Sequence, residues 1–67
     1  MGAHMVIMLF VDNKPIEMAD TLEQAKQLAE QYIARELAVR IERTAAPAPV
    51  HAWNYDYEDQ DWVERVG

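Results

Sequence analysis

The chain is short, acidic and free of cysteine, and these properties exclude several classes of protein. Its 67 residues include 12 Asp and Glu against six Lys and Arg, which gives a formal charge of −6. A chain of this length forms one domain at most and buries only about 60% of the surface that its unfolded form exposes. The absence of cysteine excludes disulfides and favours a reducing, cytoplasmic compartment. The negative charge disfavours direct binding to nucleic-acid phosphates.

The amino terminus shows where the native domain is expected to begin. Residues 1–4 have the composition of a cloning remnant, so we expect a single α+β domain over residues 5–67. No stretch combines a basic start, a long apolar run and a small-residue cleavage site, so no secretory signal is expected. The apolar run over residues 6–11 is far shorter than the ~20 residues that span a bilayer, so no membrane partner is expected.

Two strands are expected before the first helix. The β-branched and aromatic residues of positions 5–12 predict a buried strand, and Asp12-Asn13-Lys14 is typical of a turn. Residues 15–18 alternate polar and apolar side chains and begin with proline. Because proline lacks a backbone N–H, this second strand is expected at a sheet edge.

A helix is expected to begin at Asp20 or Thr21, because each can form a capping box, Asp20 with Glu23 or Thr21 with Gln24. Apolar side chains then recur at helical spacing, which predicts one face packed on a sheet and one face in water. The residues of the apolar face are Leu22, Ala25, Leu28, Ala29, Tyr32 and Ile33.

The end of this helix has two interpretations, because no Gly or Pro interrupts residues 34–42. The alternation of Leu37, Val39 and Ile41 with other side chains favours a strand over about residues 36–43. In the alternative the helix continues to about Arg43, is roughly 30 Å long and favours a dimeric helical assembly. We prefer the strand.

The last third of the chain predicts a loop and a hairpin. Two prolines make residues 44–49 an extended loop. An aromatic strand over residues 53–57, a polar turn at 58–61 and a final strand at 62–66 follow. The expected fold is α+β, with a single helix packed on a small antiparallel sheet in ββαβββ or βαββ order.

The sequence offers few routes to catalysis. It contains no Ser or Cys, which excludes the usual hydrolytic nucleophiles, and its only glycines, Gly2 and Gly67, exclude a glycine-rich phosphate loop. His51 is the one histidine beyond the expected remnant, and it is interpreted as a surface residue rather than a metal ligand. We therefore expect no enzymatic activity, no metal and no cofactor.

Acidic and aromatic residues coincide in the last hairpin. Trp53 and Trp62 are expected to pack in the core. Tyrosine is a favoured interface residue, and carboxylates beside it suit a partner with a basic, Arg- or Lys-rich surface. The candidate partner-binding residues are therefore Tyr55, Asp56, Tyr57, Glu58, Asp59, Asp61 and Glu64.

The order of these segments resembles the small phage-encoded anti-CRISPR proteins that act on type I surveillance complexes. The resemblance rests on residues 22–29 at the start of the helix, residues 39–42, the aromatic strand at 53–57 and the closing Trp62-Val63. It implies an inhibitor that sits on the basic DNA-handling surface of a CRISPR-Cas complex in the host cytoplasm. Some members of that family are more basic, so no contact residue is transferred from them. The alternative is a small self-associating structural or regulatory module, such as a homodimer, because apolar edge strands are expected on so small a domain.

Overall fold

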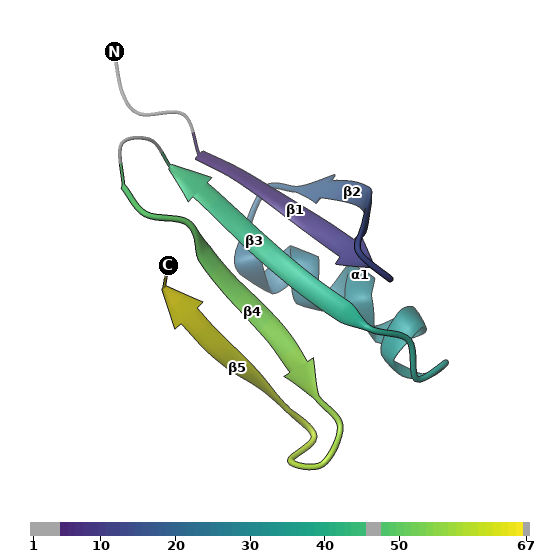
Figure 1. The fold of residues 1–67 in the computed structure, drawn as a ribbon. Helices are drawn as coiled ribbons and strands as arrows, with labels where there is room; N and C mark the ends of the chain where they lie inside the picture. The colour runs from purple at the N-terminus through teal and green to yellow at the C-terminus, as the bar shows by residue number, and fades with distance from the viewer. Residues whose placement is uncertain (1–4, 46–47, 67) are drawn as a thin grey trace.

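The computed structural model describes residues 5–45 and 48–66, so the expected remnant, part of the proline loop and Gly67 lie outside the described residues. Within the described residues the chain forms five strands and one helix in ββαβββ order, and the α+β prediction is confirmed (Figure 1). All neighbouring strands are antiparallel, in the order β2-β1-β3-β4-β5. The elements are β1 (Met5–Val11), β2 (Lys14–Ala19), α1 (Leu22–Ile33), β3 (Val39–Ala45), β4 (His51–Asp56) and β5 (Asp61–Val66).

A two-residue turn joins β1 to β2. Asp12 and Asn13 have φ angles of 53° and 66°, and positive φ at both central residues is the mark of a type I′ hairpin turn. Their short polar side chains are among the few that tolerate this backbone region. The edge position expected for the second strand is confirmed, and a bulge at Ile16 follows its proline.

The start of α1 shows which of the two capping boxes forms. The Thr21 hydroxyl accepts a hydrogen bond from the Gln24 N–H at 3.0 Å, so Thr21 is the N-cap. The Gln24 side chain accepts in return from the Asp20 N–H at 2.7 Å. Two N–H groups near the start of the helix, that of Gln24 inside it and that of Asp20 just before it, are thereby satisfied by side chains.

The strand interpretation of the segment after α1 is confirmed, since the helix ends at Ile33 and β3 begins at Val39. The Leu37 N–H donates to the Tyr32 carbonyl at 3.2 Å and the Glu36 N–H to the Ile33 carbonyl at 2.9 Å. This pair of bonds is the Schellman motif, and Glu36 holds its left-handed position with a φ of 58°. Leu37 lies in the connection rather than in the strand.

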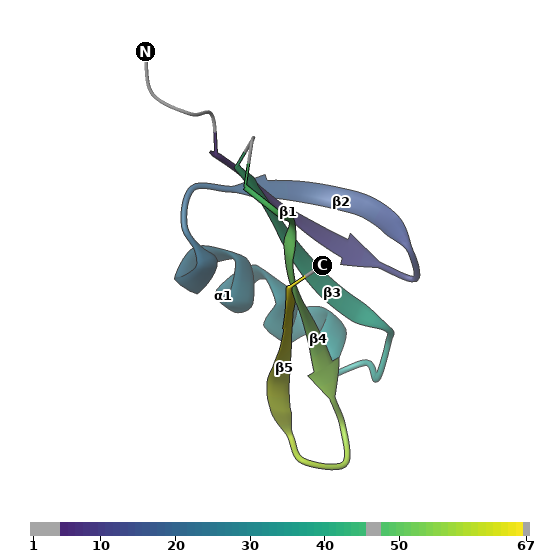
Figure 2. The ribbon, with the colours of Figure 1, turned by 60° about the vertical axis from the view of Figure 1, so that its left-hand side comes forward.

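The core lies between α1 and one face of the sheet. The helix packs on β1, β2 and β3, whereas the β4–β5 hairpin projects beyond it (Figure 2). The predicted apolar face of the helix is confirmed, because Ala25 and Ala29 are fully buried and its larger residues pack around them. The buried residues are Ile7, Leu9, Val11, Ala25, Ala29, Val39, Ile41 and Trp53.

Candidate functional site

The turn between β4 and β5 begins one residue earlier than the sequence predicts. Asp56 pairs with Asp61, so residues 57–60 form the turn and Asp61 is the first residue of β5. The Asp56 carboxylate accepts hydrogen bonds from the N–H groups of Glu58 and Asp59, at 2.9 and 3.4 Å. A side chain that bonds the backbone two and three residues ahead initiates a turn. The prediction that Tyr57 extends the strand was therefore wrong.

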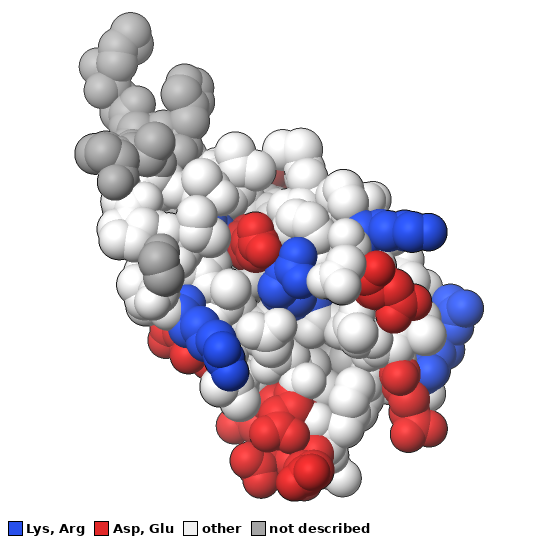
Figure 3. Space-filling view, in the orientation of Figure 1, with Lys and Arg blue, Asp and Glu red and all other residues white. Residues whose placement is uncertain are grey.

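The structure brings four of the candidate carboxylates together at the end of this hairpin. We call Asp56, Glu58, Asp59 and Asp61 the acidic turn. Figure 3 shows acidic side chains gathered at this end of the molecule. Glu58, Asp59 and Asp61 are exposed and Asp56 is half-buried. The Asp61 carboxylate accepts from the Trp62 N–H at 2.8 Å, so it too is oriented by the backbone.

Glu64 is not part of this cluster. It pairs with Trp53 across the β4–β5 ladder, so its side chain lies on the face of the sheet that carries the helix. There its carboxylate oxygen lies 3.0 Å from His51 Nδ1, which is also 3.3 Å from a guanidinium nitrogen of Arg43. The Arg43 guanidinium stacks 5.2 Å from the Trp53 ring. Glu64 therefore belongs to a separate polar cluster with Arg43 and a half-buried His51.

The aromatic residues of the hairpin pack mainly on one another and on the core. Trp53 is 7% exposed and its predicted core position is confirmed, while Trp62 is half-buried against that core. The Tyr55 ring makes edge-to-face contacts with Trp62 at 5.3 Å and with Tyr57 at 4.9 Å. This geometry favours aromatic attraction beyond simple burial. Tyr55 thus packs between Trp62 of β5 and Tyr57 of the turn.

Tyr57 ties the acidic turn to the rest of the domain. Its hydroxyl donates a hydrogen bond to the Leu37 carbonyl in the connection between α1 and β3. Loss of hydration raises the pKa of the Tyr57 phenol above its usual range, and the charges of Tyr55, Glu36 and Asp12 act in the same direction. The phenol is therefore protonated at neutral pH and serves as a donor. This bond fixes one end of the turn.

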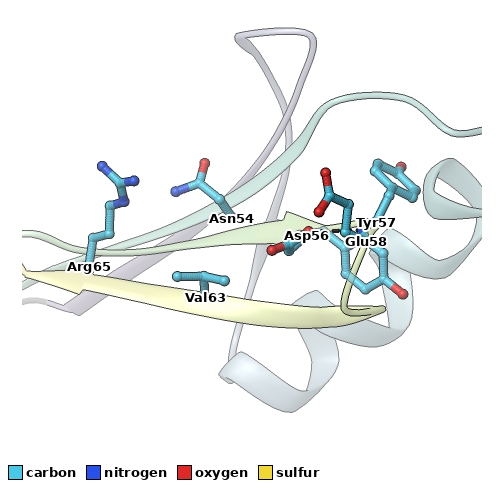
Figure 4. Close-up of a pocket in the computed structure, with 7 residues that line it drawn as sticks. Asn54, Asp56, Tyr57, Glu58, Val63 and Arg65 are labelled. Atoms are coloured by element: carbon cyan, nitrogen blue, oxygen red, sulfur yellow. Dashed lines mark hydrogen bonds between the residues drawn. The ribbon is translucent and has the colours of Figure 1, made fainter.

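An open hollow of about 720 Å³ lies beside the acidic turn, on the face of the sheet away from the helix (Figure 4). Arg65 lies at one end of it and the carboxylates of Asp56 and Glu58 at the other. Sequence reasoning missed three of its lining residues, because they depend on the register between β4 and β5, which the turn length decides. The lining residues are Asn54, Tyr55, Asp56, Tyr57, Glu58, Val63 and Arg65.

Neither a metal cluster nor a membrane-spanning helix is present in the described residues. Among residues 5–45 and 48–66, no three His, Asp or Glu side chains are grouped so that they could hold a metal ion. No helix in the described part of the chain has the length and apolarity needed to cross a membrane. Comparison with protein-family models, curated proteins and solved structures finds no match. The geometry of the β4–β5 hairpin is therefore the basis for inferring a function.

Proposed function

We propose that this chain is a non-enzymatic binding protein whose acidic turn docks on the basic surface of a protein that handles nucleic acid. The observation that carries the proposal is the gathering of Asp56, Glu58, Asp59 and Asp61 at one end of the hairpin. Carboxylates presented together attract a basic surface during encounter and oppose the approach of an acidic one. They also imitate the negative charge of the nucleic acid that such a surface normally binds.

The way the turn is held supports a binding role. The Asp56 carboxylate orders the turn backbone, and the Tyr57 hydroxyl anchors it to Leu37. A loop that is already ordered loses less conformational entropy when it binds. The acidic turn is therefore presented as a preformed surface.

The resemblance to phage anti-CRISPR proteins makes a type I CRISPR surveillance complex the first target to test. In this proposal the acidic turn covers a positively charged DNA-handling surface of the complex, in the cytoplasm of the host cell, and blocks DNA targeting. Contacts of this kind depend on charge, so their strength falls as salt screens them. No direct contact with nucleic acid is involved.

The test compares two double variants with equal changes in charge. Glu58→Gln with Asp59→Asn neutralises the exposed part of the acidic turn, whereas Glu17→Gln with Glu30→Gln neutralises two exposed carboxylates on β2 and α1. Association with a purified type I surveillance complex is measured at low salt by biolayer interferometry. We expect the turn variant to associate about tenfold more slowly and the control variant to match the wild type.

Different outcomes test the proposed binding site and the proposed target. Equal slowing by both variants would mean that net charge, not the acidic turn, carries the interaction. Tight binding that ignores both variants would place the contact elsewhere on the domain. Failure of the wild-type chain to bind the complex at micromolar concentration, or to reduce its DNA binding, would remove this complex as the target.

A second candidate function, a small self-associating module, is supported by a different observation. Both edge strands expose large apolar side chains, Ile16 and Met18 on β2 and Val63 and Val66 on β5. Sheet edges with exposed apolar residues pair readily with another strand. Light scattering over a range of concentrations tests this function, since a mass that stays monomeric throughout contradicts it.

A further inference from the structure

The two edges of the sheet differ in how they are protected. β2 has three features that discourage pairing with another strand: Lys14, Pro15 and the bulge at Ile16. β5 pairs with β4 in a regular register over its whole length, without a bulge. The helix packs on β1, β2 and β3, so it does not cover the β5 edge. β5 is therefore the edge with the geometry to accept another strand.

The backbone groups that face outward from β5 follow from the turn. Asp56 and Asp61 close the four-residue turn, and the next N–H along β5, that of Trp62, is bonded by the Asp61 side chain. Because the direction of backbone groups alternates along a strand, Trp62, Glu64 and Val66 direct theirs away from β4. An incoming antiparallel strand must therefore place its own outward residues opposite these.

The side chains on the open face of β5 form a self-complementary row. Asp61, Val63 and Arg65 alternate with the outward residues and share this face, so the row reads acid, apolar, base. Val63 is 41% exposed. Within residues 5–45 and 48–66, Arg65 takes part in no salt bridge. A strand running in the opposite direction presents the same row as base, apolar, acid.

We propose that two copies of this chain pair antiparallel along β5, with Val63 opposite Val63 of the second copy. Asp61 of each copy then lies opposite Arg65 of the other, which gives two ion pairs on either side of an apolar centre. Trp62 and Glu64 of opposite copies exchange backbone hydrogen bonds. The five-stranded sheet becomes a continuous ten-stranded sheet across a two-fold axis.

Only this register uses the charges. A two-fold axis perpendicular to the sheet requires one residue to lie opposite itself, so the two neighbouring registers are centred on Trp62 or Glu64. Centring on Glu64 places two carboxylates against each other and Val63 against Arg65. Centring on Trp62 places Asp61 against Val63. Like charges directly opposite destabilise a ladder and opposite charges stabilise it.

The pairing requires one local exchange. The Trp62 N–H gives up the Asp61 carboxylate and donates instead to the Glu64 carbonyl of the second copy. The Asp61 carboxylate is released to meet Arg65. In the monomer the Asp61 carboxylate therefore accepts a hydrogen bond from an edge N–H, and in the dimer it takes part in the interface. The two acidic turns then lie at opposite ends of the assembly, and Asp56, Glu58 and Asp59 of each turn remain outside the β5 pairing.

Charge reversal tests the proposal. Asp61→Arg and Arg65→Asp each place two like-charged pairs in the dimer, and each should weaken self-association about tenfold. In a mixture of the two variants, an arginine of one chain lies opposite an aspartate of the other at both ends, so a heterodimer should form about as well as the wild-type dimer. The double variant Asp61→Arg with Arg65→Asp should restore the homodimer. Sedimentation equilibrium measures all four samples, and a mixture that stays as weak as its components overturns the proposal.

A cysteine scan tests the register. The chain has no Cys, so Val63→Cys introduces a single thiol, and directly opposite Cβ atoms in a ladder lie about 4.5–5.5 Å apart, close to disulfide geometry. We expect Val63→Cys to form a disulfide-linked dimer under mild oxidation, with Glu64→Cys and Met18→Cys as controls that do not.

The β5 pairing rests on the second candidate function, because it requires a dimer. The results of cross-linking and of sedimentation test the two separately. A dimer that cross-links through Glu64→Cys or Met18→Cys, and not through Val63→Cys, overturns the register while self-association stands. A wild-type chain that stays monomeric overturns both. Neither result bears on the acidic turn, because the variant Glu58→Gln with Asp59→Asn should dimerise like the wild type.

Discussion

The four carboxylates of the acidic turn divide into two kinds at the scale of single residues. Asp56 and Asp61 each accept hydrogen bonds from backbone N–H groups, which fixes the position of their charge. Glu58 and Asp59 are exposed and occupy the middle of the turn. The first pair shapes the turn and the second pair presents charge, so neutralising Glu58 and Asp59 removes charge with the least effect on the fold.

Removing the Tyr57 hydroxyl should release the turn and change the response to alkali. Tyr57→Phe loses the bond to Leu37 and should lower the free energy of unfolding by about 1 kcal/mol at neutral pH. The pKa of Tyr57 is raised in the folded state, first by loss of hydration. The stability that this residue contributes is therefore complete below its unfolded pKa of about 10 and is lost as pH rises through the folded value.

Urea denaturation between pH 8 and 11 checks this prediction. The stability of the wild type should fall towards that of Tyr57→Phe as pH rises above about 10, because the variant lacks the ionisation. A constant difference between the two proteins across this range would contradict the assignment of the raised pKa to Tyr57.

The end of α1 shows, at the scale of elements, where sequence reasoning stopped. Helical spacing predicted the buried face of α1 and the alternation after it predicted β3, because both patterns are set by burial. The boundary between them lacked its usual signal, since the left-handed position of a Schellman motif is normally glycine and here it is Glu36.

The acidic and aromatic residues of the β4–β5 hairpin could be recognised from the sequence as a candidate site. That Tyr57 lies in the turn, and that Glu64 lies apart from the acidic turn, could not be predicted. They depend on the Asp56 bonds and on the register across β4 and β5.

Replacing Glu36 with glycine tests how much stability the domain loses by having glutamate at this left-handed position. Glu36 has a φ of 58°, a region that penalises residues with a Cβ and that glycine enters freely, so Glu36→Gly should raise the free energy of unfolding by about 0.5–1 kcal/mol. Arg35→Gly is the matched control. It stands one position earlier, outside the left-handed region, and should destabilise the domain by about the same amount. Thermal or chemical denaturation measures both, and equal destabilisation by the two variants would contradict the motif.

At the scale of the whole molecule, salt should affect binding through the acidic turn and pairing through β5 to different extents. The chain carries a net charge of −6, and attraction between the exposed acidic turn and a basic target is screened beyond about 10 Å at 0.1 M salt. Association with that target should therefore slow steeply between about 0.05 and 0.5 M salt, with a flatter dependence for Glu58→Gln with Asp59→Asn.

Self-association through β5 should respond differently, because two electrostatic effects oppose each other. Salt weakens the Asp61–Arg65 pairs but also screens the repulsion between two chains of charge −6, while the Val63 contact and the backbone hydrogen bonds depend little on it. The dimer dissociation constant should change by less than about threefold over the range that slows target binding. Sedimentation equilibrium at both salt concentrations checks this. A dimer that dissociates as steeply as the target complex would mean that the acidic turns, rather than the β5 edges, hold the copies together.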